Sequence, residues 1–170
     1  NMVGWVKLTV AAPKGTEIKM HFAETLTNDS DLFIANLRSA ETTDTYITKG
    51  DGSEEWMPRY TYHGFRFMEI TGFPGIPDMN NIEGQVVHDD LELNGTFECS
   101  NDVLNSIYKN CYWGIRGNYR SMPTDCPQRD ERMGWLGDRA IGSKGESFIF
   151  DVAAFHSKWL RDIQDAQKET

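Results

Sequence analysis

Residues Val6 to Phe22 read VKLTVAAPKGTEIKMHF and carry the clearest structural signal in the chain. Apolar and polar side chains alternate here in two runs separated by Pro13, Lys14 and Gly15, with apolar residues at Val6, Leu8 and Val10 and again at Ile18, Met20 and Phe22. A period of two residues is typical of strands that bury one face. The stretch therefore predicts two strands joined by a turn.

Further short segments with β-branched and aromatic residues follow at Thr43 to Thr48, Tyr60 to Thr71 and Glu83 to His88. They are separated by turn-forming sequences, GDGS at Gly50 to Ser53 and FPGIP at Phe73 to Pro77. Short strands at this spacing indicate an antiparallel β-sandwich or jelly roll.

Around Gly95 the pattern changes from strand to helix. Ser100 can act as an N-cap, and apolar residues at helical spacing predict a helix from about Asn101 to Asn118. A second apolar stripe, from Val152 to Ala166, predicts another helix. Arg139 to Phe150 is a weaker helical segment, because each of its two glycines costs about 1 kcal/mol relative to alanine.

Strands followed by helices imply two segregated domains, with a boundary near Leu93 to Glu98. We predict a β-sandwich over residues 1–96 and a helical part over residues 97–170. Two or three helices cannot bury their apolar stripes without further partners, so we expect the helical part to be the beginning of a larger domain.

The composition excludes some classes of partner. The 170 residues carry a net charge of −9 with an isoelectric point near 4.9, which disfavours nucleic acid or an anionic membrane as a partner. No apolar run approaches the roughly 18 residues that a membrane span requires. Three irregularly spaced cysteines, Cys99, Cys111 and Cys126, fit neither a disulfide framework nor a paired zinc motif.

Thr124 to Asp138 reads TDCPQRDERMGWLGD and places four acids, two arginines and a tryptophan together. Pro127, Gly134 and Gly137 make a regular helix unfavourable, so we expect a loop that delivers side chains from several directions. Loop carboxylates beside an aromatic ring suit sugar chemistry, because a carboxyl can protonate a glycosidic oxygen and an indole can cover a pyranose face. The alternative is a solvated loop of mixed charge.

This loop resembles the signature of the bacterial α-L-rhamnosidases, which are inverting glycosidases. The resemblance covers nearly the whole chain through segments that occur in the family's order: NMVGWVKLTV at Asn1 to Val10, FAETL at Phe22 to Leu26, NLRSAETTDTYI at Asn36 to Ile47, YTYHGFRF at Tyr60 to Phe67 and DVAAFHSKWLRDIQDAQ at Asp151 to Gln167. It implies a β-sandwich followed by the first helices of an (α/α)6 toroid.

The resemblance implies that Glu131 is the general acid. It implies that the rhamnose pocket is lined by Asp125, Arg129, Trp135 and Asp138. The residues alone do not distinguish Asp130 from Glu131 as the acid, since clustered carboxylates favour keeping one of them protonated. The family's general base lies beyond Thr170, so we expect the isolated chain to be inactive. We predict no metal and no cofactor.

The expected partners are a glycoside containing L-rhamnose and the remaining toroid of the same protein. Compartment is undetermined, with a slight preference for export. Two alternatives stay open: an inverting toroid hydrolase for another neutral sugar, and a noncatalytic module that binds sugar on exposed aromatic rings such as Trp5, Trp56 and those of Tyr60 to Phe67.

The remaining candidates have ordinary structural explanations. We predict a core or interdomain hydrogen-bonding role for His63 and a packing residue at His156. Four acids could ligate calcium, but EF-hand spacing is missing and turn capping is the default for Asp29, Asp31, Asp89 and Asp90.

Overall fold

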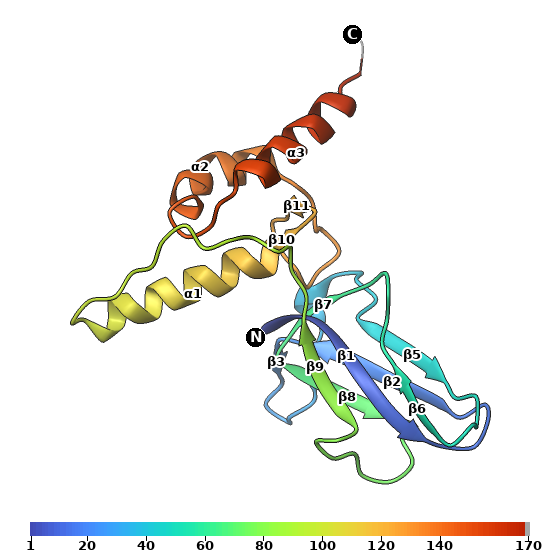
Figure 1. The fold of residues 1–170 in the computed structure, drawn as a ribbon. Helices are drawn as coiled ribbons and strands as arrows, with labels where there is room; N and C mark the ends of the chain where they lie inside the picture. Colours follow the sequence, from blue (N-terminus) through green and yellow to red (C-terminus); the bar gives the residue numbers. More distant parts are fainter. Residues whose placement is uncertain (169–170) are drawn as a thin grey trace. The chain divides into compact units, whose positions relative to one another are not determined.

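The computed structural model describes residues 1–168, and the chain divides into two compact units. The first comprises residues 1–87 together with 127–132, and the second comprises residues 88–126 and those from 133 onward. In Figure 1 the strands of the first unit run from blue to green, and the helices of the second run from yellow to red.

The first unit contains two antiparallel sheets. In one sheet β1 (Met2–Ala11) pairs with β9 (Ile82–Val86) along its middle and, nearer its two ends, with β7 (His63–Phe65) and β6 (Ser53–Trp56). In the other, β2 (Glu17–Ala23) lies between β5 (Thr43–Ile47) and β8 (Phe67–Thr71). This arrangement confirms the antiparallel β-structure that the alternating sequence predicts.

The core of the first unit comes from that alternation. The inward positions of β1 and β2 are almost wholly inaccessible to solvent, and they pack with Tyr46 and Phe65 into one apolar cluster that contains Val6, Leu8, Val10, Ile18, Met20 and Phe22. Burying side chains of this size is worth about 1.5–3 kcal/mol each relative to exposure. The two β-strands predicted from Val6 to Phe22 are therefore confirmed.

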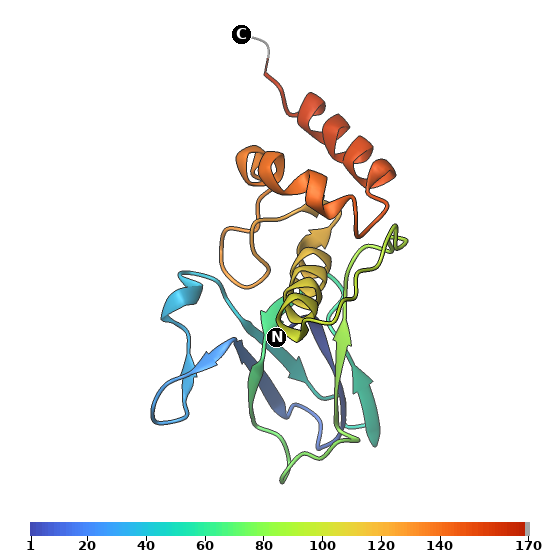
Figure 2. The same ribbon diagram turned by 90° about the vertical axis from the view of Figure 1, so that its left-hand side faces the viewer.

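Two strand predictions differ from the structure. The segment Tyr60 to Thr71 forms two strands that belong to different sheets, because the chain crosses between the sheets at Arg66, whose N–H bonds to Ala23 O at 2.9 Å. The strand β6 lies partly in the predicted GDGS break. A small pair, β3 (Thr25–Leu26) and β4 (Leu32–Phe33), and the 3₁₀ turn η1 (Ala35–Leu37) project from the sheets (Figure 2).

In its described residues, the second unit contains three helices and one short strand pair. The helices are α1 (Asp102–Asn118), α2 (Leu136–Glu146) and α3 (Ala153–Asp165), and β10 (Tyr119–Arg120) pairs with β11 (Met122–Pro123). Tyr119, Phe150 and Phe155 are at the centre of its core. The helices predicted over 101–118 and 152–166 are confirmed, and the glycine-containing segment is helical as far as Glu146.

The N-terminus of α1 differs from the prediction by one residue. The cap is Asn101 rather than Ser100, because the Asn101 side chain accepts hydrogen bonds from the N–H groups of Val103 at 3.0 Å and Leu104 at 3.3 Å. A side chain that satisfies two free donors at once is the usual stabiliser of a helix start.

Residues just after the first unit pack with the helices. Asn94 N–H bonds to Ile149 O and Asp151 N–H bonds to Glu92 O, each at 2.9 Å, which places this connecting segment in the second unit. The predicted domain boundary between residues 96 and 97 stays a prediction, because a compact unit defined by its packing contacts need not have the same boundaries as an evolutionary domain. None of the helices in the described residues is long and apolar enough to span a membrane.

Candidate active site

The acidic segment is a loop whose two ends meet. Asp125 Oδ1 accepts a hydrogen bond from Met133 N–H at 2.8 Å, and Asp125 N–H donates to Met133 O at 3.1 Å. Between these two residues the chain forms neither helix nor strand, in agreement with the predicted loop, but the end of the predicted loop is wrong, because α2 begins at Leu136 and contains Gly137 and Asp138. Asp125 thus closes the stem of a loop, in addition to any role toward a ligand.

The tip of the loop, Pro127 to Arg132, packs within the first unit. It crosses β7 at Gly64, where an added Cβ would lie 2.8 Å from Pro127 Cγ, so only glycine leaves room for this approach. Arg132 donates from Nη1 to Tyr62 O at 2.8 Å, and its guanidinium lies 4.8 Å from the centroid of the Tyr62 ring. The tip is thereby fixed on a β-strand.

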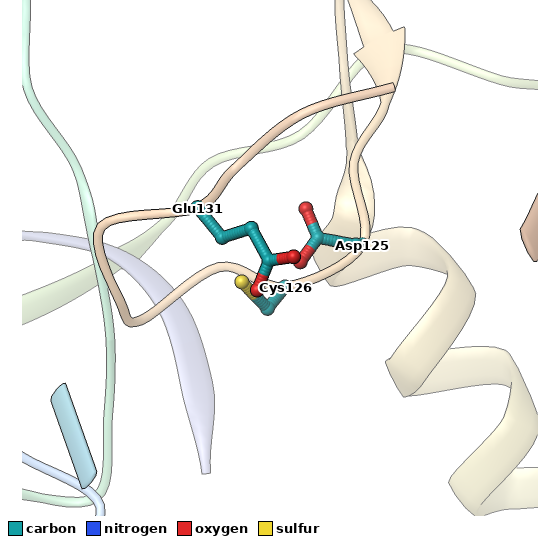
Figure 3. A group of neighbouring side chains, drawn as sticks. All are labelled: Asp125, Cys126 and Glu131. Carbon is teal, nitrogen blue, oxygen red and sulfur yellow. The ribbon is translucent and has the colours of Figure 1, made fainter. Parts of the chain in front are cut away.

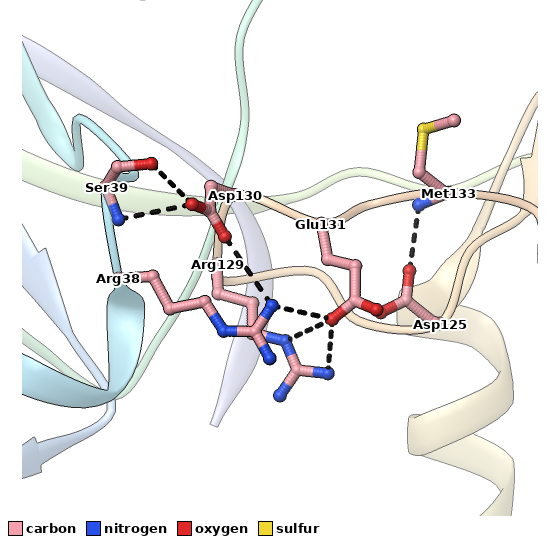
Figure 4. A network of polar contacts seen from close by, with 7 residues as sticks. All are labelled: Arg38, Ser39, Asp125, Arg129, Asp130, Glu131 and Met133. Carbon is pink, nitrogen blue, oxygen red and sulfur yellow. Dashed lines mark hydrogen bonds and ion pairs between the residues drawn. The ribbon is translucent and has the colours of Figure 1, made fainter.

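Two arginines hold Glu131. Arg129 donates to Glu131 Oε2 from Nε at 2.9 Å and from Nη2 at 2.7 Å, and Arg38 donates from Nη1 to the same oxygen at 3.1 Å (Figure 4). The Glu131 side chain is 24% exposed, so solvent and a ligand can reach it. All three bonds end on Oε2, which leaves Oε1 outside this set of bonds.

The neighbouring acid, Asp130, faces a different partner. Ser39 donates to Asp130 Oδ2 from its N–H at 3.3 Å and from its hydroxyl, and Arg38 Nη1 lies 3.9 Å from Oδ1. These contacts, the Ser39 hydroxyl first among them, lower the pKa of Asp130 below its ordinary value. The Asp130 carboxylate is thus engaged by the two residues of the turn that follows Leu37.

Arg38 adopts an unusual backbone conformation. It follows η1 with φ 59° and ψ −121°, in a turn closed by a hydrogen bond from Ala40 N–H to Leu37 O at 3.2 Å. These angles match the first central position of a type II′ turn, which glycine normally occupies. A side chain in such a position costs on the order of 1–3 kcal/mol.

Neither Arg38 nor Ser39 is among the site residues predicted from the sequence. They lie in the family-like segment Asn36 to Ile47, but their contacts reach Asp130 and Glu131, 91 and 93 residues further along the chain. No local pattern signals a contact over that separation.

Of the five predicted site residues, Arg129 and Glu131 belong to the first unit and contact each other. The other three, Asp125, Trp135 and Asp138, belong to the second unit. Trp135 precedes the first turn of α2 and is 49% exposed, and Asp138 is an exposed acid in that first turn. An exposed indole and an exposed carboxylate have the chemistry expected of a sugar-binding wall.

The loop also carries a mixed set of potential metal donors. Figure 3 shows the side chains of Asp125, Cys126 and Glu131, all borne by this one loop. A thiol with two carboxylates is not specific for any metal, and clustered acids are common without one. The prediction that the site needs no metal therefore stays a prediction.

Other candidates have structural roles. His63 is buried with its Nε2 2.9 Å from Asp44 Oδ1 and stacks on Phe22, in agreement with the predicted hydrogen-bonding core residue. Burial lowers the pKa of His156, which packs near Trp159. Trp56 is partly buried against Tyr46, which argues against a sugar-binding row of exposed rings at this position.

The chain matches two family models in succession. Residues 1–88 match the concanavalin-like domain of bacterial α-L-rhamnosidases, and residues 92–170 match their six-hairpin glycosidase domain. These matches confirm the predicted fold class, a β-sandwich followed by helices of a glycosidase toroid.

Curated and solved relatives agree with these matches. An α-L-rhamnosidase of Streptomyces avermitilis is 46% identical over an alignment that covers 98% of this chain and 16% of that protein. An α-L-rhamnosidase of Formosa agariphila is 42% identical, and the alignment covers 98% of this chain and 18% of that protein. The solved α-L-rhamnosidase of Dictyoglumus thermophilum is 50% identical with a TM-score of 0.95, over 99% of this chain and 19% of its own. The Streptomyces avermitilis α-L-rhamnosidase solved in complex with L-rhamnose is 45% identical with a TM-score of 0.93, and the match covers 99% of this chain and 16% of that one. The chain thus spans less than one fifth of these relatives.

Proposed function

We propose, from the premise that this chain belongs to the bacterial α-L-rhamnosidase family, that the protein carrying it hydrolyses terminal α-L-rhamnosides. The substrate class is supported by the relative whose structure was solved with L-rhamnose. The reaction would invert the configuration at the anomeric carbon, which needs one protonated carboxyl and one carboxylate that activates water.

Glu131 is the proton donor in this proposal. The assignment follows from the resemblance of the loop to the family's signature, and it is supported by the two arginines on Oε2, which fix the position of the carboxyl while Oε1 lies outside these bonds. Asp130 is the weaker candidate, since Ser39 donates to its Oδ2 and Arg38 faces its Oδ1, so both of its oxygens already face partners. General acid catalysis of this kind typically contributes about 10²–10⁴-fold to the rate.

The remaining residues hold the sugar. Asp125 and Asp138 accept hydrogen bonds from hydroxyl groups, Arg129 orients Glu131 and offsets negative charge, and Trp135 packs on the apolar side of the ring. The water-activating base would come from residues beyond Thr170, at about 6.5–9.5 Å from the acid as inversion requires. The 170 residues alone are then expected to release no rhamnose.

The test measures the complete gene product on an aryl α-L-rhamnoside and follows the released sugar by proton NMR. We expect β-L-rhamnose as the first product and no turnover by residues 1–170 alone. A protein that cleaves other aryl glycosides but not rhamnosides would contradict the substrate, and retained anomeric configuration would contradict the mechanism.

The assignment of the acid is tested by Glu131→Gln, which keeps the shape of the side chain but cannot donate the same proton. We expect kcat to fall by about 10²–10⁴-fold. Glu41→Gln is the matched control, because Glu41 is an exposed acid of the same unit. If Glu131→Gln keeps native activity while Asp130→Asn loses it, the acid is Asp130.

A further inference from the structure

We propose that Arg38 is a positioning residue for the proton donor, so that the first unit contributes directly to the reaction. The inference rests on the proposed function, because it assigns Arg38 a role toward Glu131 as the acid. It adds a group from a segment 93 residues away in sequence to the site that the acidic loop forms.

The contacts form a two-by-two arrangement. The adjacent residues Arg38 and Ser39 face the adjacent acids Asp130 and Glu131, with Ser39 on Asp130 at 3.3 Å and Arg38 on Glu131 at 3.1 Å (Figure 4). Because Asp130 and Glu131 are adjacent in the chain, fixing Asp130 on Ser39 also restricts the backbone from which the Glu131 side chain leaves. Arg38 then holds the end of that side chain.

Arg129 alone cannot supply the same constraint. It is separated from Glu131 by one residue on the same loop, so the Arg129–Glu131 pair adds no contact between the carboxyl and a distant segment of the chain. Arg38 belongs to the turn after η1, within the sheet-bearing unit, and its bond ties the carboxyl to a fixed frame. Rate depends steeply on such placement, because a 1 Å error at a catalytic group can cost about 10²-fold.

The backbone at Arg38 is an independent sign of function. Glycine suits φ 59° and ψ −121°, yet the chain has an arginine there, with 55% of its side chain exposed. An exposed side chain gains little from burial to offset that strain. Residues kept in unfavourable conformations are concentrated at functional sites, where the side chain is required.

The experiment uses the complete gene product and compares Arg38→Gly with Ser30→Gly. Both substitutions relieve a positive φ in the first unit, 59° at Arg38 and 69° at Ser30, but only Arg38 contacts the acidic loop. Each variant is assayed on phenyl α-L-rhamnoside, whose leaving group needs a proton, and on 2,4-dinitrophenyl α-L-rhamnoside, whose leaving group does not.

For Arg38→Gly we expect kcat on the phenyl glycoside to fall about 10- to 100-fold with KM nearly unchanged. On the dinitrophenyl glycoside we expect less than about a threefold loss, because proton donation matters little there. The urea midpoint should be equal to that of the wild type or higher, since strain is removed. Arg38→Lys should recover part of the rate, and Ser30→Gly should keep all of it.

Several results would overturn the inference. Unchanged kcat of Arg38→Gly on both glycosides, with a large loss in Glu131→Gln, would refute the positioning role and leave the proposed function intact. An equal loss on both glycosides together with a lower urea midpoint would show a structural role instead. A wild-type protein that hydrolyses neither glycoside would refute both the proposed function and this inference.

Discussion

The two units bury different groups at their centres. In the first unit the least exposed side chains are mostly apolar, including Leu8, Ile18 and Phe22, with one buried His63–Asp44 pair beside Phe22. In the second the least exposed large side chain is Tyr119, whose hydroxyl donates to Glu146, and Glu146 pairs with Arg139 at 2.5 Å. An apolar core can partly relax when one side chain is truncated. Removal of one member of a buried ionic network instead leaves another buried charge or polar group without its partner.

The second unit thus depends on groups that must remain in defined protonation states. Burial, and then the bond to Glu146, raise the pKa of Tyr119 above its ordinary value of 10.0, so its hydroxyl keeps its proton and remains a donor near neutral pH. The comparison predicts that the first unit is sensitive chiefly to side-chain volume and the second chiefly to charge and hydrogen bonding.

The largest effect is expected from Phe22→Ala in the first unit. Phe22 is fully buried and stacks on His63, so its truncation should cost about 3–5 kcal/mol of the unfolding free energy of that unit. Peptide-level hydrogen exchange of the complete gene product should show the loss in β1 and β2. The control is Ile47→Ala, because Ile47 is exposed. Equal effects of the two variants would contradict an apolar core of this importance.

Removal of the buried charge in the second unit comes next. Glu146→Ala leaves Arg139 and Tyr119 without their shared acceptor, and we expect a cost of about 3 kcal/mol, seen as faster exchange in α2 and α3. Glu98→Ala, at an exposed acid of the same unit, should change little. A negligible effect of Glu146→Ala would show that volume matters more than charge here too.

A smaller effect is expected at the start of α1. Asn101→Ala removes the side chain that caps Val103 and Leu104, at a cost of about 1 kcal/mol, whereas Asn101→Asp should retain the cap. Hydrogen exchange in the first turn of α1 distinguishes the two variants. If both behave like the wild type, the cap contributes nothing to the second unit.

The smallest difference concerns pH and Glu54, which is one of several buried polar residues in the first unit. The pKa of Glu54 is lowered to about 2, chiefly by the Tyr46 hydroxyl and also by backbone N–H groups, so its stabilising effect is complete above its ordinary value of 4.5. That effect is lost as pH falls from about 4.5 toward 2. Urea unfolding at pH 7 and at pH 3 should therefore differ less in Glu54→Gln than in the wild type. The same pH dependence in both proteins would assign the loss to other groups.

The sequence predicted those parts of the fold that repeat along the chain. The alternation in β1 and β2 and the helical stripes of α1 and α3 are local patterns, and each produces its element directly. The strand β6 was missed because Glu54 is polar and yet buried, and its burial depends on Tyr46 of another strand. The division of Tyr60 to Thr71 between two sheets depends on a chain crossing that periodicity does not reveal.

In the candidate site, too, the features that follow from local sequence could be predicted and those that depend on long-range contacts could not. The loop and its acids could be read from Thr124 to Asp138, and the resemblance supplied their proposed roles. The distinction between Asp130 and Glu131 could not be read, because it depends on Ser39 and Arg38. Those contacts arise only when distant segments fold together.

The membership of Pro127 to Arg132 in the first unit has a consequence for recombination between related genes. A crossover near residues 88–92 would join a new sandwich to the old helices and would carry the acidic loop away from Gly64, Tyr62 and Arg38. Such a chimera should keep both folds and yet lose the proposed rhamnosidase activity. Exchange of the sandwich between homologues therefore requires that the six loop residues travel with it.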